Sequence, residues 1–350
     1  MRSNVLDLTK AEPMTEQANK SLQNFLLSRE LSNKKVLVCI LNWGLGHASR
    51  CIPLIESFEK LNNEVFVLSS GPALELISKN FPGRKCIDSG EADMRYGKSS
   101  LATSIKIALQ SPRFIRNIRV EEKLVEEICQ QEQIDFILSD NRYGCRSKLA
   151  KSVFLGHQLN IPVPIGGSVV QALNKRLLNR FDEVWVPDYE GPQSLAGRLA
   201  KVLDLKVPIA YIGPLSRFNR KAAERMPSVY DKIFILSGPE PQRSLFEADI
   251  LAGKYTESSD GRMVIVRGLP QEKGELKVPE NWVSFNHLNT EELLNLIEES
   301  KEIVCRSGYS SIMDLHTIQR VAKLVPTPGQ AEQEYLALLH KSSDLILGNS

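Results

Sequence analysis

The sequence predicts an α/β protein made of two Rossmann-like domains whose parallel sheets face each other across a cleft. Apolar, β-branched runs alternate with helix-length amphipathic segments, a pattern typical of a parallel sheet covered by helices on both faces. The alternation pauses at the polar, proline-bounded stretch 214–230 and then restarts. With 350 residues the chain is long enough for two domains, which take roughly 100–200 residues each.

Strands are expected in the first domain at 35–41, 64–70, 135–140 and 182–188, with helices at 47–61, 72–80, 99–131 and 166–180. The second domain should hold strands at 232–238, 262–268, 282–288, 301–308 and 322–328. The predicted organisation is a polar extension over 1–34, a first domain over 35–213, a linker over 214–230 and a second domain over 231–350. Open parallel sheets bind ligands outside the carboxyl ends of their strands, so the cleft is the expected site.

The composition excludes several classes of protein. A formal net charge of +2 is too small for a nucleic-acid-binding protein, and no apolar stretch is long enough to span a membrane. The first thirty residues lack the features of a signal peptide, which indicates a cytoplasmic protein. The six cysteines form no C-x-x-C pair and are expected to be buried thiols, with neither disulfides nor a zinc site.

The stretch "LNWGLGHASR" (41–50) joins the first strand to a helix and carries the first candidate site. A helix N-terminus attracts anions, and glycines let the backbone come close to a ligand. The spacing differs from the G-x-G-x-x-G fingerprint of nicotinamide-binding proteins. We expect Asn42, Gly44, Gly46, His47 and Arg50 to line the cleft, the alternative being a tight corner with a hydrogen-bonded histidine.

Three turns of the second domain carry further candidates. In "ILSGPEPQRSLF" (235–246), Ser237, Gly238 and Arg243 are placed to approach a phosphate, although most corners of this kind bind nothing. In "CRSGYSSIMDL" (305–315), the residues after Gly308 could donate to an anion, and Asp314 could accept from a sugar hydroxyl. "PTPGQAEQEYLA" (326–337) would, taken alone, be an ordinary helix start.

The segments "NHLNTEELLNLIEESKEIVCRSGYSSIMDL" and "AKLVPTPGQAEQEYLA" resemble the donor half of GT-B glycosyltransferases. The resemblance is closest to the peptidoglycan N-acetylglucosaminyl transferase that makes lipid II and to its relatives. The "NWGLGH" turn is similar to that family's N-terminal glycine loop. Together with "SDNRYG" (139–144) it also resembles a less characterised group of bacterial glycosyltransferases.

The resemblance implies a nucleotide-sugar donor, UDP-linked, held mainly by the second domain, and an unidentified acceptor held by the first. Asp314 would grip the ribose, in place of the family's usual glutamate, and His287 and Leu288 would hold the base. The diphosphate and sugar contacts would come from Arg306, Ser307, Gly308, Tyr309, Ser310, Gln330, Glu332 and Gln333. No D-x-D metal pair is present, so no metal or other cofactor is expected. Many relatives have a longer C-terminal segment that packs on the first domain, so looser closure is expected here.

The expected reaction moves a hexose or N-acetylhexosamine to the acceptor. His47 would take the acceptor proton, with Asp140 as the alternative base. Backbone N–H groups after Gly308, together with Ser237 and Arg243, would stabilise the leaving diphosphate. Asn141 and Arg142 would recognise the acceptor. His157 could equally be a ligand-binding group or a buried structural histidine.

Two further questions stay open at this stage. The basic and apolar mixture over 98–119 could rest on an anionic membrane carrying a lipid-linked acceptor, at the inner face of the plasma membrane, or form a solvated helix face. The alternative functions are a non-hydrolysing nucleotide-sugar epimerase, a non-catalytic nucleotide-sugar-binding subunit and, less favoured, a nicotinamide oxidoreductase.

Overall fold

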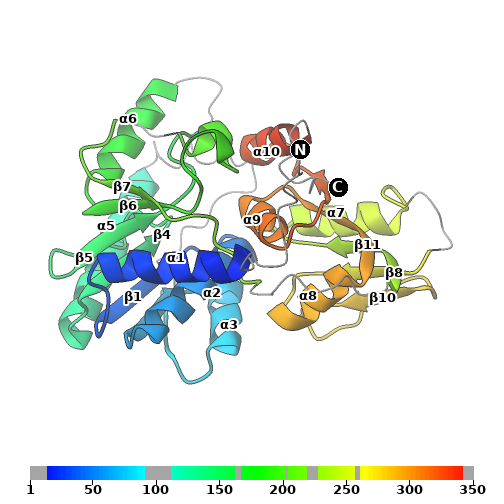
Figure 1. The fold of residues 1–350 in the computed structure, drawn as a ribbon, viewed down its shortest axis with the longest axis horizontal. Helices are drawn as coiled ribbons and strands as arrows, with labels where there is room; N and C mark the ends of the chain where they lie inside the picture. Colours follow the sequence, from blue (N-terminus) through cyan, green and yellow to red (C-terminus); the bar gives the residue numbers. More distant parts are fainter. Residues whose placement is uncertain are drawn as a thin grey trace, which may run out of the picture.

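A computed structural model describes residues 14–90, 112–161, 167–201, 204–218, 228–256 and 261–341 of the chain. It contains two sheets in which every strand pair is parallel. The sheets stand in two bodies side by side (Figure 1). We call the body built on the sheet β1–β7 the first half, and the body built on the sheet β8–β12 the second half.

The seven-stranded sheet of the first half has the order β3-β2-β1-β4-β5-β6-β7. Its strands are β1 (Lys35–Ile40), β2 (Glu64–Ser69), β3 (Lys85–Asp88), β4 (Phe136–Asp140), β5 (Lys151–Leu155), β6 (Glu183–Val186) and β7 (Ile209–Tyr211). The strand order reverses between β1 and β4, where Val36 pairs with Phe136 and Ile40 with Asp140. Such a reversal opens a crevice at the carboxyl ends of the two strands.

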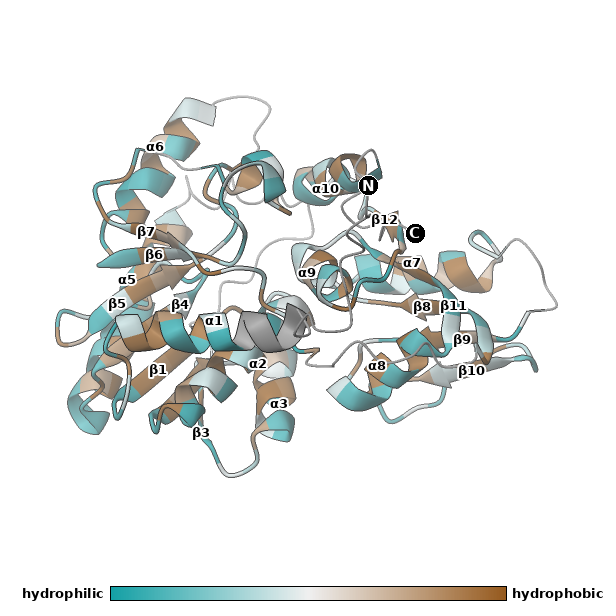
Figure 2. Ribbon diagram, in the orientation of Figure 1, coloured by the Kyte–Doolittle hydropathy of each residue, from teal (hydrophilic) through white to brown (hydrophobic). Residues whose placement is uncertain are grey.

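Side chains alternate across this sheet, as the pleat of a strand requires. On β1, Val36, Val38 and Ile40 belong to one apolar cluster, whereas Leu37 and Cys39 belong to another. The helices of this half are α1 (Met14–Ser28), α2 (Leu45–Lys60), α3 (Gly71–Asn80), α5 (Pro112–Glu132) and α6 (Gly167–Leu178), with 3-10 turns η3 (Gly191–Gln193) and η4 (Gly197–Leu199). In Figure 2, β1 is mostly hydrophobic, whereas helices such as α6 and α8 carry both hydrophobic and hydrophilic residues.

The five-stranded sheet of the second half has the order β10-β9-β8-β11-β12 and reverses between β8 and β11. Its strands are β8 (Tyr230–Ile235), β9 (Met263–Val266), β10 (Trp282–Phe285), β11 (Ser300–Arg306) and β12 (Lys323–Val325). Its helices are α7 (Gln242–Leu251), α8 (Thr290–Glu298), α9 (Tyr309–Thr317) and α10 (Ala331–Lys341). Asn289 and Glu292 form a capping box that starts α8, the arrangement that satisfies two free N–H groups of a helix N-terminus.

Helices α9 and α10 lie between the two bodies (Figure 1). Ile312 and Met313 of α9 and Leu336 of α10 are buried in the same cluster as β1 and α2. The side chain of His340 on α10 also lies 2.8 Å from the backbone oxygen of Leu195. The two halves therefore share a packed boundary, and the expectation of loose closure did not anticipate these contacts.

Candidate functional site

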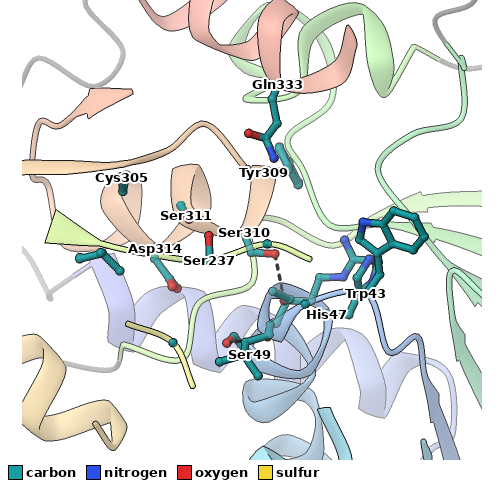
Figure 3. A pocket seen from close by; sticks show the side chains of 18 of the residues that line it. Trp43, His47, Ser49, Ser237, Cys305, Tyr309, Ser310, Ser311, Asp314 and Gln333 are labelled. Atoms are coloured by element: carbon teal, nitrogen blue, oxygen red, sulfur yellow. Dashed lines mark hydrogen bonds between the residues drawn. The ribbon is translucent and has the colours of Figure 1, made fainter. Parts of the chain in front are cut away.

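A pocket lies between the two halves at the carboxyl ends of the strands where each sheet reverses. From the first half, the stretch 41–50 at the end of β1 and the start of α2 lines it through all its residues except Asn42 and Ala48, together with Asn141 after β4. Leu236–Pro239 after β8 and Gly308–Ser311 after β11 line it from the second half. Figure 3 shows Trp43 and His47 facing Ser237, Ser310 and Asp314 across this space. Both crevices that the strand orders create thus open into one site.

Two glycines of the loop after β1 allow the halves to touch. Gly44 has a φ of 70°, which other residues rarely adopt, and its absent Cβ would lie 3.5 Å from the Cα of Gly238. A Cβ on Gly46 would lie 2.9 Å from the hydroxyl oxygen of Ser310. The Ser310 hydroxyl donates to the backbone oxygen of Gly46 at 2.9 Å, the dashed line in Figure 3. These glycines therefore permit a close contact between the two halves.

His47 forms a pair with Asp140 at the centre of this wall. Its Nδ1 lies 2.7 Å from an Asp140 carboxylate oxygen, and Arg50 donates to the other oxygen through Nε at 2.9 Å and through Nη2. Asp140 is fully buried, whereas the His47 side chain is 16% exposed. An Nη of Arg50 also lies 3.0 Å from this Nδ1. An ionised carboxylate only accepts hydrogen bonds, and its contact with Nδ1 is the shorter of the two, which favours a proton on Nδ1 of the neutral imidazole. Nε2 is then the basic nitrogen.

The pKa shifts in this cluster favour that protonation state. Burial lowers the pKa of His47 and outweighs the opposite effect of Asp140. Burial would raise the pKa of Asp140, but Arg50 and His47 reverse this and hold it below its usual value. At neutral pH the cluster therefore carries a carboxylate, a guanidinium and a neutral imidazole. The prediction of Asp140 as an alternative base is wrong, because its buried oxygens are both bonded and do not line the pocket.

The N-terminus of α9 faces the pocket from the other side. Gly308 is its N-cap residue and no side chain caps the helix, so the first N–H groups are free to meet an anion. Cβ atoms on Gly308 and on Gly238, which has a φ of 105°, would meet only open space. The backbone on both loops is therefore open to a ligand.

Asp314, one turn into α9, lies against the segment that joins the halves. One of its oxygens accepts from the Ser216 hydroxyl at 2.6 Å, and the other lies 3.7 Å from Nε of Arg217. That Nε is buried and has no hydrogen-bond partner among the described residues. Burial raises the pKa of Asp314 although Arg217 opposes it, and burial also lowers the pKa of Arg217. Both side chains line the pocket.

Most of the predicted site residues line this pocket: Gly44, Gly46, His47, Arg50, Asn141, Ser237, Gly238, His287, Leu288, Gly308, Tyr309, Ser310, Asp314, Gln330, Glu332 and Gln333. Three predicted residues of the second half do not. Arg243 is paired with Glu240 and Glu247 at 2.6 and 2.8 Å. Arg306 donates to the backbone oxygens of Pro326 and Gln242, and Ser307 donates to that of Gln333. The structure does not support their expected contact with the donor, because none of the three lines the pocket, although Nε of Arg306 has no hydrogen-bond partner among the described residues.

Besides Asp140, two predicted residues of the first half lie away from the pocket. Arg142 is fully buried and pairs with Glu121 at 3.1 Å, so the expectation that it faces the acceptor is wrong. The Asn42 amide donates to the Ser70 hydroxyl at 3.2 Å and holds the loop after β1 to the start of α3.

The side chains that line the pocket also include Trp43 and Arg217, which the prediction missed, and His157, which it left open between a ligand group and a buried structural histidine. Trp43 lies within the 41–50 stretch that was predicted to line the cleft, and an aromatic residue in that stretch could have been predicted to contact a ligand. Arg217 lies in the segment read as a linker, and His157 follows β5, which the sequence pattern did not predict as a strand. Their positions depend on the packing of the two halves.

No site for a metal ion emerges from these residues. Within the described ranges, no group of three or more histidine, cysteine, aspartate or glutamate residues could hold one.

No family model matches the sequence, but curated relatives do. One, from Methanosarcina acetivorans and named an uncharacterized glycosyltransferase, is 25% identical over 86% of this chain and 79% of its own length. Another of that name, from Methanosarcina mazei, is also 25% identical, over 86% of this chain and 82% of its own. These relatives are archaeal, so the predicted likeness to a bacterial group stays a prediction, as does the closer likeness to the lipid II-forming enzyme.

Solved structures match over nearly the whole chain. The glycosyltransferase SnogD from Streptomyces nogalater superposes with a TM-score of 0.54 at 14% identity, covering 88% of this chain and 85% of its own. UGT89C1 from Arabidopsis thaliana in complex with UDP-L-rhamnose gives 0.52 at 12%, covering 90% and 92%. The spinosyn rhamnosyltransferase SpnG in complex with thymidine diphosphate gives 0.53 at 14%, covering 88% and 85%. The chain has the GT-B fold of these structures, and its curated relatives support a glycosyltransferase enzyme.

Proposed function

We propose that this protein transfers a hexose or N-acetylhexosamine from a nucleoside diphosphate sugar, UDP-linked, to an acceptor hydroxyl. The observation that carries the proposal is the placement of a histidine–aspartate pair opposite a free helix N-terminus, across one pocket. The histidine–aspartate pair supplies a base with a free Nε2, and the helix N-terminus supplies a site for a diphosphate. A transferase needs both within reach of one sugar.

The donor would lie along the second half. Its diphosphate would sit at the N-terminus of α9, against Gly238 and Ser310, with the base between His287 and Leu288. Asp314 would accept from the ribose, and Gln330, Glu332 and Gln333 would contact the sugar. Structural neighbours carry either a uridine or a thymidine nucleotide. We favour UDP because Asp314 offers a carboxylate to a 2′-hydroxyl that thymidine diphosphate lacks.

In the reaction, the acceptor oxygen would form a bond to the anomeric carbon while the bond from that carbon to the diphosphate breaks. The acceptor proton would pass to Nε2 of His47. The charge on the leaving diphosphate would be met by the N–H groups of α9 and by Arg217, which replaces Arg243 in this role. We expect no requirement for a metal ion, so the transfer rate should be unchanged by a chelator such as EDTA.

The proposal is tested by calorimetric titration with UDP, GDP, ADP, dTDP and NAD. We expect one nucleoside diphosphate, UDP, to bind and NAD not to bind. Arg217→Gln and Asp314→Ala should each weaken binding about tenfold or more, since a hydrogen bond to a charged group is worth roughly 1.5–3 kcal/mol. Arg243→Gln is the matched control, because Arg243 lies outside the pocket. Absence of binding by every nucleotide would overturn the donor site.

The first half also lines the pocket with large apolar and aromatic side chains, among them Trp43, Phe114, Tyr143 and Ile161. This lining supports an acceptor with an apolar part, and we propose a lipid-linked one. Of the helices that the structure describes, none has the length and apolar character needed to cross a membrane.

The segment 98–119, expected either to contact a membrane or to form a solvated helix face, lies mostly outside the described residues. On α5, the exposed Arg116 and Arg119 flank apolar positions of which Ile115 is 37% exposed. Flotation with vesicles containing phosphatidylglycerol should carry the protein upward, and Arg116→Glu with Arg119→Glu should abolish this. Failure of the wild type to float would remove the membrane contact while leaving the transferase proposal intact.

A further inference from the structure

We infer that His157 is a positioning residue that orients the sugar-side carboxylate of Glu332 and connects it to the His47–Asp140 pair. The inference rests on the proposed function, because it assigns Glu332 to the donor sugar. It adds a residue of the first half to recognition of a sugar that the second half holds.

His157 is held by groups from both halves. Its Nδ1 lies 3.2 Å from an Nη of Arg50 in the first half, and its Nε2 lies 2.9 Å from an oxygen of Glu332 in the second half. Its ring stacks on that of Tyr309 from α9, with centroids 4.0 Å apart and planes 15° from parallel. The Tyr309 hydroxyl in turn donates to the backbone oxygen of Pro187 at 2.8 Å. The ring can therefore neither rotate nor slide without breaking contacts across the boundary.

The chemistry of these partners fixes the protons on His157. A guanidinium only donates, so Nδ1 must accept from Arg50, and a carboxylate only accepts, so Nε2–H must donate to Glu332. One neutral tautomer satisfies both contacts. Since Arg50 also donates to Asp140, which accepts from His47, hydrogen bonds run without interruption from Glu332 to His47. The sugar-side carboxylate and the base are thus placed relative to each other by side chains.

Glu332 keeps one oxygen for a ligand. His157 takes one carboxylate oxygen, and within the described residues the other has no hydrogen bond. Burial would raise the pKa of Glu332, but the hydrogen bond from His157 reverses this and keeps the carboxyl ionised. The Glu332 side chain is 12% exposed and lines the pocket. The free oxygen is therefore placed to accept from a sugar hydroxyl, with its direction set by His157.

The test separates sugar binding from nucleotide binding. We would titrate wild type, His157→Phe and His157→Gln with UDP and with UDP-glucose, UDP-galactose, UDP-N-acetylglucosamine and UDP-N-acetylgalactosamine. His157→Phe should weaken binding of the preferred UDP-sugar about tenfold or more and leave the Kd for UDP within twofold. His157→Gln should restore binding of the sugar to within about threefold, because its amide can donate to Glu332 and accept from Arg50.

A matched control removes another histidine contact across the same boundary. His340→Phe loses the contact from α10 to the backbone of Leu195 but leaves the pocket lining unchanged. It should alter neither Kd. If His157→Phe weakens UDP and UDP-sugar equally, or weakens neither, the inference is overturned while the proposed function stands. If wild type binds no nucleotide, the proposed function itself fails.

Discussion

Replacing Asp140 with asparagine tests the proposed base most directly. The change keeps the size of the side chain and removes the charge that two donors share. In the wild type, His47 donates to one oxygen and Arg50 to the other. An asparagine amide offers one oxygen and one NH2, so one of these donors must then face an N–H group.

The expected magnitudes follow from burial. Asp140 is fully buried and Arg50 is 2% exposed, so the variant leaves a nearly buried guanidinium without its counter-charge. Breaking a buried ion pair costs about 3–5 kcal/mol of folding stability. Loss of the correct His47 tautomer should also remove most of the benefit of a general base, which is about 10²–10⁴-fold in rate, or about 3–5 kcal/mol in activation free energy.

The assay measures kcat with the donor and acceptor pair that the titrations identify, and the unfolding midpoint by calorimetry. Glu121→Gln is the matched control, because it also removes a buried carboxylate facing a buried arginine, Arg142, but outside the pocket. Both variants should lower the unfolding midpoint, and only Asp140→Asn should lower kcat by two orders of magnitude or more. If Asp140→Asn keeps kcat within threefold of wild type, the assignment of His47 and Asp140 is refuted.

Four other outcomes are expected. His47→Ala should lower turnover about 10²-fold or more while the Kd for the donor changes little, and equal losses in both would contradict its role as a base. Because the pKa of His47 is lowered from 6.5, kcat/KM should fall only as pH drops below about 6.5, and an acid limb above that value would argue against this histidine. Below about pH 6.5, His47 binds a proton in the unfolded chain more readily than in the folded protein, so the free energy of unfolding should also fall as pH drops. His47→Gln should reduce this pH dependence. Gly46→Ala should lower the free energy of unfolding by about 1 kcal/mol, because its Cβ would displace the Ser310 hydroxyl. If the same substitution costs as much in a Ser310→Ala background, the clash with that hydroxyl is not the cause.

The central strands could be predicted because they are buried on both faces. β1, β2, β4, β8 and β9 are apolar runs of high β propensity, and their expected positions agree with the structure. β3 and β7 are edge strands of four and three residues with no buried side chain, so no hydrophobic pattern marks them. β5 was missed although four of its five residues are buried.

The site was predictable where it depends on strand ends and unpredictable where it depends on charge neutralisation. His47, Gly238 and Gly308 each follow a strand, so the fold rule alone places them at the cleft. For an arginine beside such a turn, the strand end does not decide whether its side chain is free to bind a ligand or is neutralised by a carboxylate. Arg243 is neutralised by Glu247 one turn further along its own helix, and Arg142 by Glu121 on α5. Arg217 keeps a buried nitrogen without a hydrogen-bond partner among the described residues, and no pattern in the sequence around it marks this.

The position of α10 has a consequence for the order in which the protein folds. This helix is the last that the structure describes along the chain, yet Leu336 is buried in the core of the first half. Its neighbour Tyr335 accepts a hydrogen bond from the backbone of Arg198. During synthesis, the first half leaves the ribosome with part of its apolar surface uncovered until α10 arrives. Contacts between residues so far apart in the sequence slow folding. Because the first half on its own would expose the apolar surface that α10 covers, we expect separately expressed halves to aggregate unless they are produced together.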